Sequence, residues 1–200
     1  MKIKSVDLKS FFVLIMSIII LSCDDNSENL FVKIDSNTSN VKFNNQIIEN
    51  DTLNILNEEY VFNGGGVAAA DFDNDGKTDL FFTGNQQPNR LYLNQGEFVF
   101  KDISESAKIL AQDKWSTGVT YVDINNDNLL DIYVCAAMYK ENRRNMLFIN
   151  KGVNPETGII SFEEKASEYG IDDSGNSMGA VFFDYNKDGL IDLFVLNNEQ

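Results

Sequence analysis

Residues 66–82 read Gly66-Val-Ala-Ala-Ala-Asp71-Phe-Asp73-Asn-Asp75-Gly76-Lys-Thr-Asp79-Leu-Phe-Phe82. The same pattern returns at residues 118–134 and again at residues 179–195, so the first aspartates of successive copies are 52 and 61 residues apart. Repeats with a period in this range are typical of propeller blades or solenoid turns. The repeated stretch therefore predicts an array of similar structural units.

Each copy consists of short apolar runs separated by turns rich in Asn and Gly. Strands are expected before and after the aspartates, at the run that ends in Asn94 or Asn150, and at the Phe-rich run that follows. Helical turns are expected near residues 104–110 and 166–170, but no amphipathic helix stands out. Four short strands in about 50 residues make a unit the size of a propeller blade. The sequence thus predicts an all-β fold.

The unit boundaries are expected near residues 61–112, 113–172 and 173–200, the last unit being incomplete. Three units are too few to close a ring, so the predicted architecture is a partial β-propeller, and the chain is expected to be a piece of a larger one. The lead-in segment, residues 31–60, matches no repeat. It is expected to be irregular, with one strand at residues 41–43.

The nine-residue loop in each copy carries side-chain oxygens at positions 1, 3, 5 and 9. Carboxylates this close together repel one another unless a cation lies among them, and oxygen-only ligands on a flexible loop suit Ca²⁺. Position 7 is expected to add a backbone carbonyl. Up to three calcium sites are therefore predicted. Their ligands are Asp71, Asp73, Asp75, Lys77 and Asp79; Asp123, Asn125, Asp127, Leu129 and Asp131; and Asp184, Asn186, Asp188, Leu190 and Asp192.

Position 6 of each loop is expected to need a positive φ, which glycine and asparagine tolerate best. Gly76 and Gly189 fill it in the outer copies, whereas Asn128 makes the middle loop depart from the pattern. The loop pattern also resembles two other structures. An EF-hand requires Glu at position 12, which is apolar in all three copies. Metal-free Asx turns are disfavoured because Asp recurs at positions 1, 5 and 9 in every copy.

The N-terminus reads as a targeting segment. A basic head precedes the mostly apolar residues 11–21, a run too short to span a bilayer and typical of a secretory signal. The run ends at Ser22-Cys23, which resembles a bacterial lipobox. We therefore expect a signal peptide over residues 1–22, lipidation of Cys23, an acidic tether over residues 23–30, and export to the outer membrane or cell surface of a Gram-negative bacterium. Cys135 lies in an apolar run and is expected to be buried.

Composition excludes several classes of protein. The formal charge is −15, which disfavours nucleic-acid binding. The chain has no histidine, so it contains no Ser-His-Asp or Cys-His catalytic arrangement and no His-ligated metal site. Its two cysteines are too few for a disulfide scaffold.

The repeat resembles the FG-GAP/VCBS repeat of integrin α-subunit β-propellers and, more closely, the bacterial cartilage acidic protein-like, ASPIC/UnbV-associated proteins. The stretches Tyr60-Val-Phe-Asn-Gly-Gly-Gly66, Asn89-Arg-Leu-Tyr-Leu-Asn94 and Trp115-Ser-Thr-Gly118 carry this resemblance, which covers roughly residues 31–200. It implies that each calcium loop joins the first two strands of a blade, and that seven blades commonly close the ring.

These observations predict a non-catalytic function: a calcium-binding, lipid-anchored propeller module that binds a protein or glycan ligand at the cell surface. The alternative is a propeller scaffold within a larger, possibly polysaccharide-processing, surface protein. An enzyme such as a glycoside hydrolase is disfavoured, because the repeated carboxylates are accounted for as calcium ligands.

Overall fold

The computed structural model describes residues 30–138 and 142–198. The predicted signal peptide and the lipidation site at Cys23 lie outside these residues. The chain divides into two compact units, residues 1–33 and residues 34–200. In the first unit the structure describes residues 30–33, which lie in no helix or strand.

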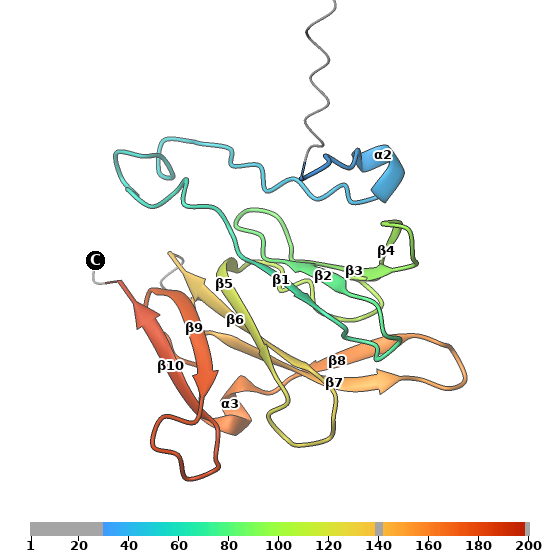
Figure 1. The fold of residues 1–200 in the computed structure, drawn as a ribbon. Coiled ribbons are helices and arrows are strands. Elements are labelled where there is room, and N and C mark those ends of the chain that lie inside the picture. Colours follow the sequence, from blue (N-terminus) through green and yellow to red (C-terminus); the bar gives the residue numbers. More distant parts are fainter. Residues whose placement is uncertain (1–29, 139–141, 199–200) are drawn as a thin grey trace, which may run out of the picture. The chain divides into compact units, whose positions relative to one another are not determined.

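The described part of the second unit contains three antiparallel sheets (Figure 1). The first sheet has the order β1 (Val67–Ala70), β2 (Asp79–Phe82), β3 (Arg90–Asn94) and β4 (Phe100–Asp102). The second has the order β5 (Trp115–Val122), β6 (Asp131–Ala137), β7 (Met146–Val153) and β8 (Ile160–Glu164). The third pairs β9 (Ser177–Phe183) with β10 (Asp192–Asn197).

Two of these sheets are meanders in which each strand pairs with the next along the chain, as expected for propeller blades. The all-β prediction is confirmed, and so is the four-strand composition of the two complete units. The helices described are single turns, α2 (Ser36–Ser39) and α3 (Ala166–Tyr169), the second of which matches an expected helical turn. Residues 104–108 form a turn rather than a helix. The three sheets described do not close a ring, and the unit boundaries stay predictions.

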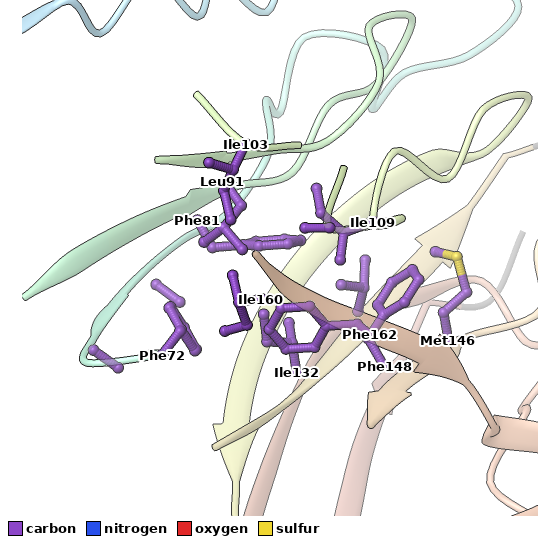
Figure 2. Packing of buried hydrophobic residues seen from close by; sticks show 14 residues of the cluster. Phe72, Phe81, Leu91, Ile103, Ile109, Ile132, Met146, Phe148, Ile160 and Phe162 are labelled. Carbon is purple, nitrogen blue, oxygen red and sulfur yellow. The ribbon is translucent and has the colours of Figure 1, made fainter. Parts of the chain in front are cut away.

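Strand β6 is buried on both faces, which explains its continuous apolar sequence. Successive side chains of a strand point to opposite faces. Ile132 and Val134 accordingly belong to the core between the first and second sheets (Figure 2). Tyr133 and Cys135 belong to the core between the second and third sheets. The prediction that Cys135 is buried is confirmed.

The first strands of neighbouring sheets, β1, β5 and β9, are called here the inner strands, and they approach one another closely. The N–H of Gly66 donates to the carbonyl of Thr117 at 2.8 Å, and the Thr117 hydroxyl donates to the carbonyl of Ser177 at 2.7 Å. A Cβ at Gly118 would lie 2.6 Å from the carbonyl oxygen of Met178, so only glycine fits there without backbone movement. The glycines at the start of the first two copies, Gly66 and Gly118, are thus explained by contact between sheets.

The outer face of the first sheet, which faces away from the second, is covered by the lead-in segment. The Phe43 ring stacks on Phe82 with centroids 5.2 Å apart. The side chain of Asn45 exchanges hydrogen bonds of 2.6 and 2.9 Å with the side chain and N–H of Asn85. The predicted strand at residues 41–43 is wrong. Side-chain contacts rather than a backbone ladder hold this segment, so it needs no extended pairing.

The third sheet buries only one of its faces. Phe182, Leu193 and Val195 pack against the second sheet. The alternate side chains point away from it and are about half exposed. These exposed residues, called here the outer face of the third sheet, are Val181, Phe183, Phe194 and Leu196.

Candidate metal centre: three aspartate loops

The aspartate loops occupy equivalent places in the three sheets. Residues 71–78 join β1 to β2, residues 123–130 join β5 to β6, and residues 184–191 join β9 to β10. Each loop follows the inner strand of its sheet and turns the chain into the next strand. The structure therefore places every sequence-predicted ligand residue in a loop or at its exit.

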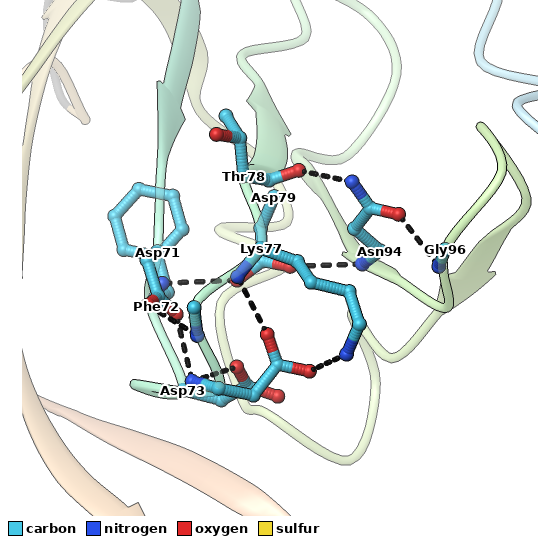
Figure 3. A network of polar contacts seen from close by, with 10 residues as sticks. Asp71, Phe72, Asp73, Lys77, Thr78, Asp79, Asn94 and Gly96 are labelled. Atoms are coloured by element: carbon cyan, nitrogen blue, oxygen red, sulfur yellow. Dashed lines mark hydrogen bonds and ion pairs between the residues drawn. The ribbon is translucent and has the colours of Figure 1, made fainter.

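Position 1 of each loop organises the turn through its carboxylate, as Figure 3 shows for the first loop. One oxygen of Asp71 accepts the N–H of Asp75 at 3.0 Å and the other accepts the N–H of Gly76 at 2.8 Å. Asp123 and Asp184 accept the corresponding N–H groups at 2.9–3.1 Å. The three loops thus share one backbone conformation.

Two residues in each loop adopt a left-handed conformation. The predicted positive φ at position 6 is confirmed, with 86° at Gly76, 65° at Asn128 and 87° at Gly189. Position 4 is also left-handed, in the residues Asn74, Asn126 and Lys187. The position 4 conformation was not predicted. Asparagine in two of the three copies is the signal that could have revealed it.

Position 9 ties each loop to its sheet. In the first sheet, Asp79 accepts the N–H of Phe72 at 2.9 Å and the N–H of Asn94 on β3 at 2.8 Å. Asp131 repeats both bonds in the second sheet. Asp192 accepts only the bond from within its own loop among the described residues. Burial raises the pKa of Asp79 to about 6 and also raises the pKa of Asp131.

One carboxylate cluster in the first loop has the spacing of a metal site. Oxygens of Asp71, Asp73 and Asp79 all lie within 4.8 Å of one another and could hold a metal ion. Burial, and then the neighbouring charge of Asp75, raises the pKa of Asp73. The negative charges of Asp73 and Asp79 are therefore only partly compensated within the protein, as those of a cation-binding cluster would be.

The remaining predicted ligands lie beside the cluster rather than in it. The Asp75 carboxylate pairs with the Lys77 ammonium at 2.5 Å, and this hydrogen bond lowers the pKa of Asp75. In the other two loops the amide at position 3 donates to the carboxylate at position 5, at 2.9 Å in each case. The position 7 residues, Lys77, Leu129 and Leu190, donate their N–H groups to position 5. Their role as carbonyl ligands stays a prediction.

A pair of asparagines that sequence reasoning did not single out supports the loops. The Asn94 side chain donates to the carbonyl of Thr78 at 2.9 Å and accepts the N–H of Gly96 at 2.8 Å. Asn150 makes the equivalent bonds and also donates to the carbonyl of Phe72, in the first loop, at 2.8 Å. The signal was their recurrence at the same place in both tails. Asn150 thereby links the second sheet to the loop of the first.

Comparisons with known proteins agree with the repeat. Residues 71–134 match the family model of the FG-GAP-like repeat. Over 139 residues, 68% of its length, the chain is 33% identical to cartilage acidic protein 1 of Homo sapiens and 32% identical to that of Mus musculus. It is 29% identical to that of Xenopus tropicalis. The chain spans about a fifth of the length of these relatives.

These comparisons show that the chain carries an FG-GAP-like repeat and is similar to cartilage acidic protein 1. They also correct one prediction. The predicted location, the outer membrane or cell surface of a Gram-negative bacterium, is wrong. The matched relatives are animal proteins, which point away from that location. In the part of the chain that the structure describes, no helix combines the length and apolar character that crossing a membrane requires.

Proposed function

We propose that the chain forms part of a calcium-stabilised propeller module that binds a protein or glycan partner. The observation that carries this proposal is the carboxylate cluster of Asp71, Asp73 and Asp79, in a loop whose conformation recurs in the two other sheets. Oxygen donors on a turn held by its own backbone suit a hard cation. In the second and third loops, the equivalent positions 1, 3 and 9 would hold the ion with one amide oxygen in place of a carboxylate.

Calcium in these loops would stabilise the fold rather than carry out chemistry. The loops connect the first two strands of each sheet, and position 9 bonds to the third strand where one is present. At about 1 mM calcium and a Kd of about 10⁻⁴–10⁻³ M, each site contributes about 0.4–1.4 kcal/mol. Partner binding then depends on calcium through the stability of the sheets.

The test is calcium titration of the full chain, followed by calorimetry and by thermal melts in about 2 mM calcium or in chelator. We expect saturable binding of up to three ions and a higher Tm with calcium. Asp71→Ala should remove one ion from the stoichiometry. The matched variant Asp73→Asn gives the first loop the ligand set of the other two and should weaken binding without abolishing it. A cooperative melt that ignores calcium, with no ion bound, would refute the proposal.

The partner class is tested separately. The chain would be applied to a glycan array and to cell surfaces, each with calcium and with chelator. Binding lost in chelator and in Asp71→Ala supports a calcium-dependent binding module. Calcium binding without any ligand on either surface would retain the metal sites and reject the binding function.

A further inference from the structure

The interface between the second and third sheets contains a fully bonded polar cluster. The Asn145 amide donates to the Tyr133 hydroxyl at 3.0 Å and to the Ser177 hydroxyl at 2.9 Å. The Tyr133 hydroxyl donates in turn to the carbonyl of Ile171 at 2.7 Å. Each polar side-chain atom in this cluster therefore has a partner, as buried polar groups require.

The interface between the first and second sheets has the equivalent asparagine and serine, but a phenylalanine in place of the tyrosine. By position in the repeat, Asn89 corresponds to Asn145 and Ser116 to Ser177, while Phe81 stands where the other interface has Tyr133. Phe81 lies two residues after the position 9 aspartate, as Tyr133 does in the next copy. Ser116 precedes Gly118 by two residues, as Ser177 precedes Gly179.

The orientation of the Asn89 side chain is set by the backbone. Its oxygen accepts the N–H of Gly84 at 3.1 Å, just as the oxygen of Asn145 accepts the N–H of Ala136 at 2.8 Å. The nitrogen of Asn89 must then point in the direction in which the other interface has the Tyr133 hydroxyl. An amide flip would place two donors against each other and is excluded.

Two buried polar atoms at this place have no hydrogen-bond partner among the described residues. They are the side-chain nitrogen of Asn89 and the hydroxyl of Ser116, and both residues are fully buried. The Ser177 hydroxyl has a further bond of 2.7 Å to the Asn197 side chain, but the strand partner of Ser116 is Ala136, which offers only a methyl group. Among the described residues, no protein atom therefore bonds to the Asn89 nitrogen or to the Ser116 hydroxyl.

We propose that one water molecule is bound between the Asn89 amide and the Ser116 hydroxyl. The water accepts a hydrogen bond from the Asn89 amide and shares one with the Ser116 hydroxyl. Buried waters typically make about three hydrogen bonds to polar groups that would otherwise be unpaired. A water at this place would pair both the Asn89 nitrogen and the Ser116 hydroxyl. The first interface is thus joined through a water, whereas in the second Asn145 bonds directly to Ser177 and Tyr133 bonds directly to the carbonyl of Ile171.

The Ser116→Ala variant of the full chain tests the proposal, because the sign of the change in Tm depends on whether a water bonds to the hydroxyl. If a water bonds to Ser116, Ser116→Ala removes a hydrogen bond and should lower the Tm by about 2–4 °C. If the hydroxyl has no partner, the same variant leaves the Tm unchanged or raises it, which would overturn the proposal. Ser177→Ala is the matched control, because its hydroxyl is bonded directly to protein and its loss lowers the Tm in either case.

A crystal structure that shows ordered waters tests the position. We expect a water within hydrogen-bond distance of both the Asn89 nitrogen and the Ser116 oxygen. A direct bond between Asn89 and Ser116, or no water within reach of both atoms, would overturn the assignment.

Discussion

Asn150 offers a measurable link between two sheets. Its side chain donates to the carbonyls of Phe72 and Leu130 and accepts the N–H of Gly152, and the residue is buried. Asn150→Ala removes all three bonds. Asn94→Ala removes the two equivalent bonds within the first sheet but no bond between sheets. The two variants therefore differ in the bond to Phe72 and in burial, since Asn150 is buried and Asn94 is half-buried.

The expected magnitude follows from that one bond. A buried carbonyl left without its donor costs about 1–3 kcal/mol. For a chain of this size, 1 kcal/mol corresponds to about 2–4 °C in Tm, so Asn150→Ala should melt about 2–12 °C below Asn94→Ala. Thermal melts of both variants at one fixed calcium concentration give the comparison. Equal Tm values would refute the idea that Asn150 couples the sheets.

Three further predictions concern single positions. Gly118→Ala should lower the Tm by several degrees because its Cβ meets the Met178 carbonyl, whereas Gly179→Ala, which meets no atom within 4 Å, should leave stability nearly unchanged; thermal melts compare them. Asn128→Val places a β-branched residue at a φ of 65° and should cost about 1–2 kcal/mol in urea unfolding, while Asn128→Gly should not. Burial raises the pKa of the Cys135 thiol to about 12, so in a Cys23→Ser background a thiol reagent at neutral pH should label it only after denaturation; rapid labelling of the folded protein would contradict its burial.

The features that could be predicted from the sequence are those determined by neighbouring residues in the chain. The aspartate spacing indicated the turn between two strands, and the left-handed position at Gly76 and Asn128 followed from which residues tolerate a positive φ. The burial of Cys135 followed from its apolar neighbours. Each of these features depends on residues within about one turn or strand of the position concerned.

Contacts between distant residues escaped prediction. The bond from Asn150 to Phe72 joins residues far apart in the chain, and an asparagine next to a turn is adequately explained by the turn itself. The expected strand near Phe43 failed for the same reason, because the segment is held by side chains of the first sheet. The pairing of Asp75 with Lys77 was local, yet it competes with the assigned ligand role of Asp75, and spacing alone does not show which contact a side chain makes.

The two terminal faces of the array differ in what they offer to another molecule. The outer face of the first sheet is covered by Phe43 and its neighbours, whereas Phe194 and Leu196 on the outer face of the third sheet are more than half exposed. A further sheet could pack on Phe194 and Leu196 in the way that the third sheet packs on the second. The equivalent surface of the first sheet is already occupied by the lead-in segment. The lead-in segment thus gives the described array a direction, because it favours the addition of sheets at the side of the third sheet.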